Sequence, residues 1–394
     1  MVEDILVDLV GNFADGKTTL VRALTNESAL RDSEEKKRGI TIRLGYAHFK
    51  LFKCLECGKF SRSEKCEFCG GKTELYRRVS VIDSPGHKML MATMLSGIGL
   101  ADGAIMVISA ANACPQPQTE EHMEALKILG IKNLVVAQTK VDLIGTQKAK
   151  ESFAQIKAFL DKNGFSDAKI IPTFANQNIN IEEVVQEIGK FELPDRKSSE
   201  KLKMQVIRSF DVNNPGTDIK DLKGGVLGGG LNSGKLSLGD KILVTPNIAP
   251  NSKFKSIKSA AVYIQSEFGE ENAVGRGLSI GVLTNLDPSL ARRDALVGSV
   301  ITSEDNPPRL DNRLKISYEP INDKKVFDKP IQKGEALLLN ILSSRAVGTV
   351  QEISKGEMYI SLGDVSIPFF TGDKAVVSRK VKNAWTLAGS GTIL

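Results

Sequence analysis

The sequence predicts an α/β domain with a mostly parallel, doubly wound sheet, followed by two all-β barrel domains. Two observations lead to this prediction. Over the first 190 residues, short apolar runs alternate with segments of helical spacing, which is typical of parallel strands joined by helices. From Met204 onward, short β-branched runs are separated by Gly, Asn and Pro about every eight to twelve residues, as in small barrels.

Within the first domain, each predicted element follows from an apolar run or from helical spacing. The predicted strands are bounded by turn or polar residues and lie at 5–10, 78–82, 104–109, 134–138 and 169–172. Apolar residues at helical spacing predict separate helices at 120–129 and 181–189, and a helix start at 17–24. Because strands and helices alternate, we expect helices on both faces of the sheet.

Two segments that are rich in proline and charge separate the predicted domains. They lie at 193–203, which reads LPDRKSSEKLK, and at 303–313, which reads SEDNPPRLDNR. We therefore predict a first domain over 1–200 and two β-barrel domains over 201–305 and 306–394.

Length and composition agree with this organisation and exclude several classes of protein. The chain has 394 residues, of which 41% are hydrophobic and 25% charged, as in ordinary globular proteins. No apolar run approaches the roughly 20 residues of a membrane helix. The N-terminus carries Glu3 and Asp4 where a signal peptide carries lysines. We expect a cytoplasmic protein with no membrane contact.

The net charge of +6 is unevenly distributed along the chain. Residues 1–195 carry 25 basic and 26 acidic side chains, whereas residues 196–394 carry 28 basic and 21 acidic side chains. The excess of positive charge in the second half suits a polyanionic partner. A solvated basic surface explains the same bias equally well.

Residues 11–18, which read GNFADGKT, fit the phosphate-loop pattern G-x-x-x-x-G-K-[ST] between a predicted strand and a predicted helix. Glycines let backbone N–H groups converge on phosphate oxygens at the helix N-terminus. The lysine neutralises phosphate charge, and the threonine hydroxyl binds Mg²⁺. The predicted phosphate contacts are Gly11, Asn12, Phe13, Ala14, Asp15, Gly16, Lys17, Thr18 and Thr19.

A second phosphate-sensing motif, D-x-x-G, follows the predicted strand at 78–82. Asp83 is placed to hold Mg²⁺ through water, and Gly86 to offer its N–H group to a γ-phosphate. His87 comes next and is our candidate catalytic residue, because its ring can orient an attacking water. Thr41, in the string RGIT, is a candidate second hydroxyl on Mg²⁺, with backbone groups around Gly39 beside it.

The base-recognition motif follows the predicted strand at 134–138. A carboxylate at Asp142 can accept both the N1–H and the N2–H of guanine, which adenine does not present, and Lys140 can cover the base. The order of phosphate loop, D-x-x-G and [NT]-K-x-D is that of GTPases, so GTP and GDP are the predicted ligands. The predicted base contacts are Thr139, Lys140, Asp142, Phe174, Ala175 and Asn176.

Four of the five cysteines lie within sixteen residues, as Cys54-x2-Cys57-x8-Cys66-x2-Cys69. This paired C-x2-C spacing is typical of a tetrahedral Zn²⁺ site, and a cytosolic chain disfavours disulfides. A segment this small has no core of its own, so we expect the metal to supply its folding energy. Cys114 is unpaired and is interpreted as a half-buried apolar residue.

Longer strings resemble translational GTPases and, in detail, the gamma subunits of archaeal and eukaryotic translation initiation factor 2. The resemblance covers essentially the whole chain. Beside the four cysteines, the strings are RGITIRLGYA at 38–47, RRVSVIDSPGH at 77–87, LMATMLSG at 90–97, CPQPQTEEHMEALKILGI at 114–131, DIKDLKGGVLGG at 218–229, LDPSLARRDALVGSV at 286–300 and WTLAGSGTI at 385–393.

This resemblance implies a G domain and two β-barrels, arranged as in elongation factor Tu. It implies a protein-synthesizing GTPase that is slow without partners and that carries methionylated initiator tRNA to the small ribosomal subunit at the mRNA start. GTP hydrolysis then releases the tRNA. The implied partners are alpha and beta subunits in a heterotrimer, and Tyr46 is implied to lie near the tRNA acceptor end. The lean length resembles archaeal members.

Three departures from the family pattern change what is expected of the site. The family usually has Asp at Ala14 and His at Asp15, so we predict one Mg²⁺ rather than two. It usually has Asn at Thr139, whose hydroxyl is shorter, so weaker nucleotide affinity is expected. It usually has Ser at Phe174, where the needed donor is a backbone N–H group.

Two alternative functions stay open on the sequence alone. One is a specialised elongation-type carrier of an aminoacyl-tRNA, against which the cysteine segment counts. The other is a GTP-binding scaffold with little hydrolysis, which Ala14 and Asp15 keep open.

Overall fold

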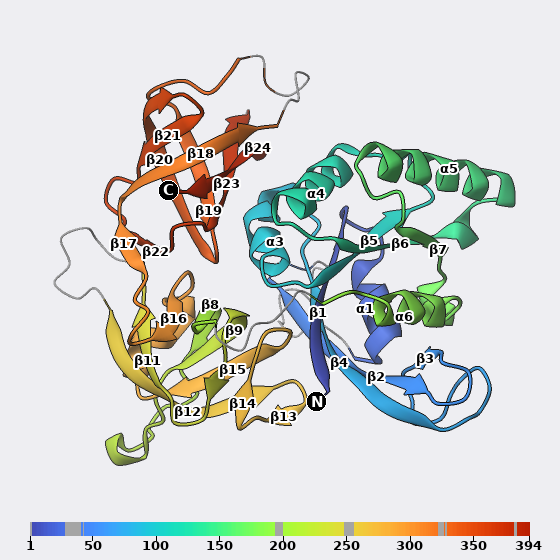
Figure 1. Ribbon diagram of the computed structural model, residues 1–394, viewed down its shortest axis with the longest axis horizontal. Helices are drawn as coiled ribbons and strands as arrows, with labels where there is room; N and C mark the ends of the chain where they lie inside the picture. Colours follow the sequence, from blue (N-terminus) through green and yellow to red (C-terminus); the bar gives the residue numbers. More distant parts are fainter. Residues whose placement is uncertain are drawn as a thin grey trace. The chain divides into compact units, whose positions relative to one another are not determined.

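The computed structural model describes residues 2–27, 41, 43–193, 200–247, 256–321, 327, 329–381 and 384–394. The chain forms two compact units, Met1–Asp195 and Arg196–Leu394 (Figure 1). Our predicted boundaries at 200 and 305 remain predictions. Among the described residues, no helix is long and apolar enough to cross a bilayer.

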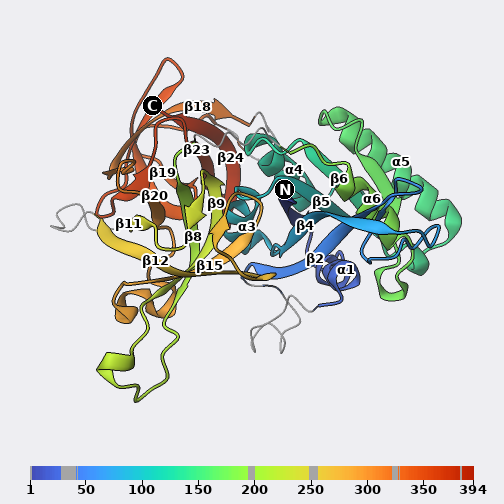
Figure 2. The same cartoon turned by 60° about the horizontal axis from the view of Figure 1, so that its bottom comes forward.

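The first unit is built on a seven-stranded sheet in the order β3-β2-β4-β1-β5-β6-β7. The five strands from β4 to β7 in this order are parallel, and β2 and β3 are antiparallel additions at one edge. Figure 2 shows β2 beside β4. The strands are β1 (Glu3–Gly11), β2 (Gly45–Cys54), β3 (Phe60–Ser61), β4 (Thr73–Asp83), β5 (Gly103–Ser109), β6 (Asn133–Thr139) and β7 (Lys169–Pro172).

Helices cover both faces of this sheet, which confirms the predicted fold class. Buried residues of α1 and α6 share one core with alternate residues of the central strands, and α3 and α4 lie on the other side (Figure 1). The α-helices are α1 (Lys17–Thr25), α3 (Met91–Ile98), α4 (Pro117–Ile128), α5 (Thr146–Lys162) and α6 (Ile181–Gly189). Short 3-10 turns are η1 (Lys88–Leu90), η2 (Val141–Leu143) and η3 (Ala175–Gln177).

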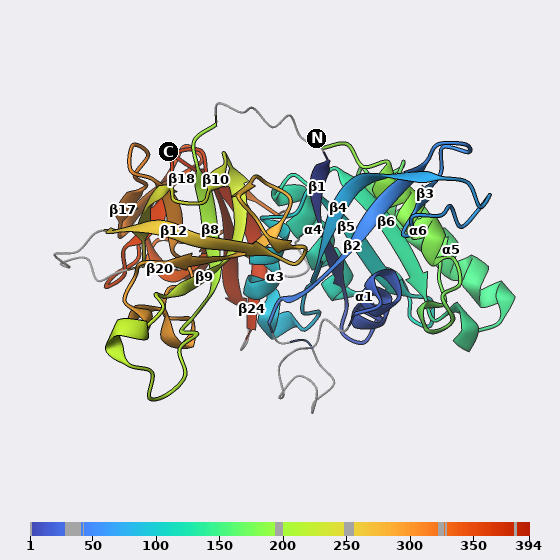
Figure 3. The ribbon, with the colours of Figure 1, turned by 90° about the horizontal axis from the view of Figure 1, so that it is seen from below.

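The second unit begins with a barrel that pairing of β11 with β12 closes. Apolar side chains that alternate along its strands form one core, and the loop that contains η4 (Ile219–Asp221) projects from it (Figure 3). The strands are β8 (Lys203–Phe210), β9 (Val226–Ser233), β11 (Lys241–Thr245), β12 (Ile257–Ser266), β15 (Ser279–Thr284) and β16 (Val300–Ser303), with the short strands β10 (Leu236–Ser237), β13 (Gly269–Glu270) and β14 (Ala273–Val274) and the turn η5 (Pro288–Asp294).

A second closed barrel, in the order β18-β21-β20-β19-β23-β24, follows within the same unit. It has its own core, and an ion pair from Lys203 to Asp373 connects it with β8. The segment that we predicted as a linker, 303–313, contains a short strand that pairs with β22. The strands are β17 (Arg309–Asp311), β18 (Arg313–Pro320), β19 (Ala336–Ile341), β20 (Ser344–Ser354), β21 (Glu357–Ser361), β22 (Ile367–Phe369), β23 (Lys374–Val381) and β24 (Ala384–Ile393).

Candidate nucleotide site and cysteine cluster

The loop between β1 and α1 needs glycine at both of its ends. Gly16 caps α1 in the left-handed region, with φ of 97°, which few other residues adopt without strain. A Cβ atom on Gly11 would lie 2.3 Å from the carbonyl oxygen of Val107 on β5. The backbone of residues 11–16 can therefore wrap closely around the N-terminus of α1, where unpaired N–H groups favour an anion.

The side chain of Lys17 folds back along this loop. Its Nζ atom donates to the carbonyl oxygens of Gly11 and Asn12, both at 2.9 Å. Burial lowers the pKa of Lys17, and the carboxylates of Asp83 and Asp15 oppose that shift. The ammonium group is therefore already held along the loop that we predict to bind phosphate.

Two hydroxyl groups and one carboxylate converge beside the loop. The Oγ1 atom of Thr18 donates to Oδ2 of Asp83 at 2.6 Å and lies 3.2 Å from Oγ1 of Thr41. Thr41 also donates to Asp83, at 3.3 Å. Hydroxyl and carboxylate oxygens are the hard ligands that Mg²⁺ prefers, so these residues fit the ion. Gly39 lies outside the described residues.

The D-x-x-G segment passes directly over the phosphate loop. A Cβ atom on Gly86 would lie 2.3 Å from Nζ of Lys17 and 2.6 Å from the carbonyl oxygen of Gly11. Only glycine allows this close approach. The structure therefore brings Gly86 to the place where a sensor of a terminal phosphate is needed.

His87 caps the short turn η1 at its N-terminal end and is exposed. Its Nδ1 atom accepts a hydrogen bond from the N–H group of Met89 at 3.3 Å, which leaves Nε2 as the nitrogen that can face a water. Its ring meets Phe13 edge-on, with 6.2 Å between centroids. The phosphate loop and the candidate catalytic histidine thus lie together.

The base-recognition residues follow β6 and β7. Asp142 lies exposed in η2. Phe174, just before η3, and Ala175, its first residue, are half-buried, and Asn176 is exposed within η3. Lys140 has a φ of 56°, which turns the chain sharply after β6. The Oγ1 atom of Thr139 donates to the carbonyl oxygen of Asp15 at 2.6 Å, so one hydroxyl joins this loop to the phosphate loop.

Replacing Thr139 with valine is expected to lower the stability of the first unit by about 1–3 kcal/mol, because buried carbonyl groups lose their donor. Thr139 is only 5% exposed, so water is poorly placed to compensate. Denaturant unfolding would measure the change in the free energy of unfolding. Thr139→Ser is the control, since it keeps the hydroxyl, and equal losses in both variants would contradict the role of this hydrogen bond.

Several polar contacts of the site were not predicted from the sequence. Asp15 Oδ2 accepts the N–H of Asn12 at 3.1 Å and closes the loop, and Asn12 Nδ2 donates to Gln116. Ser84 donates to Oδ2 of buried Asp8 at 3.0 Å, and burial raises the pKa of Asp8 well above its usual range. A carboxylate inside an apolar strand was the one sequence signal for Asp8; Gln116 offered none.

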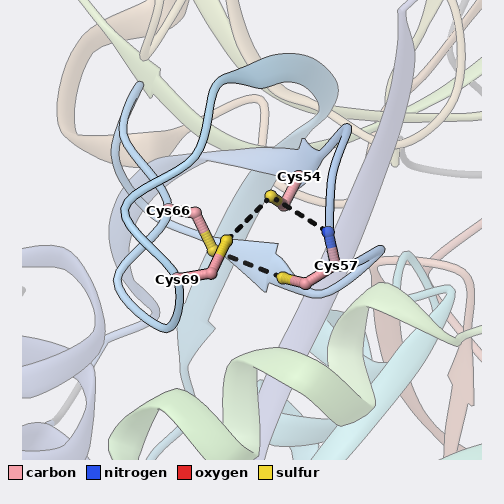
Figure 4. Close-up of side chains that lie close together, drawn as sticks. All are labelled: Cys54, Cys57, Cys66 and Cys69. Atoms are coloured by element: carbon pink, nitrogen blue, oxygen red, sulfur yellow. Dashed lines mark hydrogen bonds between the residues drawn. The ribbon is translucent and has the colours of Figure 1, made fainter.

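The four cysteines of the paired motif meet at one point (Figure 4). Their sulfur atoms lie within 4.8 Å of one another, with Cys54 and Cys69 3.5 Å apart and Cys57 and Cys66 3.6 Å apart. Tetrahedral ligands at about 2.3 Å from Zn²⁺ lie about 3.8 Å apart, so the cluster fits this ion. A hydrogen bond from the Cys69 backbone lowers the pKa of Cys66 to about 6, which favours the thiolate that a metal needs.

We expect one zinc per chain in tag-free protein, measured by elemental analysis. The double variant Cys57→Ser, Cys69→Ser is expected to lose the metal and to unfold at a lower temperature, because the metal organises the segment. Cys114→Ser is the control, since burial raises the pKa of that thiol to about 12 and removes it as a ligand. Metal content unchanged in the double variant would refute the assignment.

Comparisons with known proteins agree with this geometry. Residues 4–193 match the model of the elongation factor Tu GTP binding domain, and residues 314–393 match that of the C-terminal region of initiation factor eIF2 gamma. Translation initiation factor 2 subunit gamma of Pyrococcus furiosus is 40% identical over 402 residues, which cover 99% of this chain and 97% of the relative. The protein of the same name from Methanocaldococcus jannaschii is 40% identical over 401 residues, with the same coverage.

Two solved structures share the fold. A bacterial selenocysteine-specific elongation factor superposes with a TM-score of 0.77 at 24% identity over 99% of this chain, which spans 58% of that protein. Elongation factor SelB of Methanococcus maripaludis, in complex with the GTP analogue GppNHp, superposes with a TM-score of 0.76 at 21% identity, over 100% of this chain and 79% of that one. At these identities the likeness concerns the fold alone.

Proposed function

Because the chain belongs to the family of translation initiation factor 2 gamma subunits, we propose that it carries methionylated initiator tRNA to the small ribosomal subunit in its GTP-bound form. As a translational GTPase, it then hydrolyses GTP and releases the tRNA. The observation that carries the nucleotide half of this proposal is the convergence of Thr18, Thr41 and Asp83 beside Lys17.

Each part of the site has a proposed role. The backbone of residues 11–19 and the ammonium group of Lys17 bind the phosphates, and Gly86 senses the terminal one. Mg²⁺, held by Thr18 and Thr41 with Asp83, supplies charge neutralisation when bound. Asp142 reads the base, with Thr139, Lys140 and residues 174–176 around it, and His87 orients the attacking water.

The proposed partners follow from the family and from charge. The family implies alpha and beta subunits in a heterotrimer and a complex at the mRNA start, and this role supports a cytoplasmic location. The basic half of the chain, 196–394, suits contact with tRNA. We propose that it contributes two barrel domains, over 201–305 and 306–394, to that surface.

Initiator tRNA is expected to bind about tenfold or more tightly with a non-hydrolysable GTP analogue than with GDP, as in a switched carrier. The dissociation constant would be measured with methionylated initiator tRNA across a series of salt concentrations. Each neutralised phosphate should contribute about −0.7 to −0.9 to the log–log slope.

Aminoacylated elongator tRNA is the control in this binding experiment. Equal affinity for both tRNAs would favour the elongation-type carrier. Equal affinity in the GTP-analogue and GDP states would contradict a nucleotide-switched carrier of any kind.

A further inference from the structure

One arginine of the cysteine segment reaches out of that segment into the nucleotide-binding part of the first unit. Arg62 follows β3 and lies between the two cysteine pairs. Its Nη1 atom donates to the carbonyl oxygens of Ala23 at 2.6 Å and Leu24 at 2.8 Å. Its Nε atom donates to Oε1 of Glu182 on α6 at 2.8 Å. The guanidinium group therefore joins three segments that are distant in sequence.

The two carbonyl groups belong to the last turn of α1 (Lys17–Thr25). The last four carbonyl groups of a helix lack partners within the helix, and a positive charge there is favoured by the helix dipole. Arg62 thus caps the C-terminal end of α1 from outside. Lys17 and Thr18, which we assign to phosphate and Mg²⁺, form the opposite end of the same helix.

The cysteine segment is also fixed to α6, so Arg62 is not a loose contact. The side chain of Gln186 accepts from the N–H of Phe60 at 3.0 Å and donates to the carbonyl oxygen of the same residue. A Cβ atom on Gly189 would lie 2.3 Å from the Phe60 ring, so this ring packs on the helix backbone. Beyond β3, the stretch that carries Arg62 leads to Cys66 of the cluster, and the hydroxyl group of Thr73 donates to the carbonyl oxygen of Ser63 at 3.2 Å.

We propose that Arg62 is a positioning residue that couples the metal state of the four-cysteine cluster to nucleotide affinity through α1. With metal bound, the segment is ordered and Arg62 holds the C-terminal end of α1. Without metal, the stretch that carries Arg62 is no longer fixed at Cys66. The carbonyl groups of Ala23 and Leu24 at the end of α1 then lose the donor that Arg62 supplies. α1 has nine residues and is about 14 Å long, so its capped end and its phosphate end belong to one short rigid element.

Such coupling must act in both directions, because it is a free energy shared by two binding events. If metal tightens GTP binding, GTP must tighten metal binding by the same factor. A factor of about fivefold lies at the lower end of usual coupling. The inference rests on the proposed zinc occupancy. Zinc content is therefore measured first, so that a protein without zinc is distinguished from a zinc-bound protein without coupling.

The test compares GTP affinity in zinc-loaded and chelator-stripped protein, using a fluorescent GTP analogue, in the wild type and in Arg62→Gln. Stripping is expected to weaken binding by about fivefold in the wild type. In Arg62→Gln, affinity should already be lowered by a similar factor and should no longer respond to the metal. GTP should slow the release of zinc to a chromophoric chelator in the wild type but not in Arg62→Gln. Arg62→Lys keeps the charge, so it should recover part of the change in GTP affinity on stripping.

Arg77→Gln is the matched control. Arg77 also donates to carbonyl groups near the end of a helix, those of Gly189, the last residue of α6, and of Phe191 beyond it, and it pairs with Glu3. That helix carries no predicted phosphate ligand, so this variant should lose stability but keep the link between metal and GTP. The proposal is overturned if stripping leaves wild-type GTP affinity unchanged, or if Arg62→Gln responds to stripping as the wild type does. If Arg62→Gln does not fold, the same comparison is made with Arg62→Lys, and a full wild-type response there overturns the role of Arg62.

Discussion

Replacing Asp142 with asparagine is expected to lower GTP affinity by about 10²–10⁴-fold and to create binding of xanthosine triphosphate. The carboxylate accepts two hydrogen bonds from guanine, and each bond to a charged group contributes about 1.5–3 kcal/mol. An asparagine amide offers one acceptor and one donor, which matches the edge of xanthine, where a carbonyl replaces the amino group. Competition against a fluorescent GDP analogue would measure both affinities.

Asp167→Asn is the matched control for this variant, because Asp167 is an exposed carboxylate on the same unit and the charge change is identical. It is expected to bind GTP like the wild type. If Asp142→Asn also kept the wild-type preference for GTP, another residue would have to recognise the base, and the assignment of base recognition to Asp142 in η2 would be wrong.

Replacing His87 with alanine is expected to slow partner-stimulated GTP hydrolysis by about 10²–10⁴-fold, the usual contribution of a group that handles the proton of a nucleophile. GTP affinity should stay the same, because the exposed ring of His87 accepts a hydrogen bond from the N–H group of Met89 and meets the ring of Phe13 edge-on. Single-turnover hydrolysis with ribosomal subunits and the activating factor would separate the two effects. His87→Gln, which keeps a hydrogen-bonding side chain, should fall between the two.

Met89→Ala is the control for the surface around His87, since Met89 is 78% exposed on the same turn and has no proton-accepting group. Its hydrolysis rate should remain near that of the wild type. Stimulated hydrolysis that survived in His87→Ala would show that a different group, from this chain or from a partner, orients the water.

The strands and helices that carry the nucleotide motifs could be predicted from sequence because their patterns are local. β7 (Lys169–Pro172) and α6 (Ile181–Gly189) match the predicted ranges, since an apolar run or helical spacing marks each of them. The strands β2 and β3 were not predicted. β3 has only two residues, too few for an apolar pattern, and β2 (Gly45–Cys54) runs into the cysteine segment.

The hydrogen bonds that organise the site join residues far apart in the sequence, so no local sequence pattern predicts them. Thr139 was expected to bind guanine less well than the usual asparagine, yet its hydroxyl lies against the carbonyl of Asp15. No sequence pattern singled out Arg62, because its partners Ala23 and Glu182 lie far away in sequence. Such pairings arise only when the sheet places separate loops side by side.

The closure of the two barrels has a consequence for the speed of folding. In each barrel the first strand must find a late one: β8 pairs with β16, and β18 pairs with β24. The entropy of closing such long loops is lost before the contacts are gained, which slows folding. The slow step in refolding the Arg196–Leu394 unit should therefore be the meeting of these distant strands. Because β24 is paired with both β18 and β23, its late arrival leaves two neighbouring strand edges exposed to aggregation in the interval.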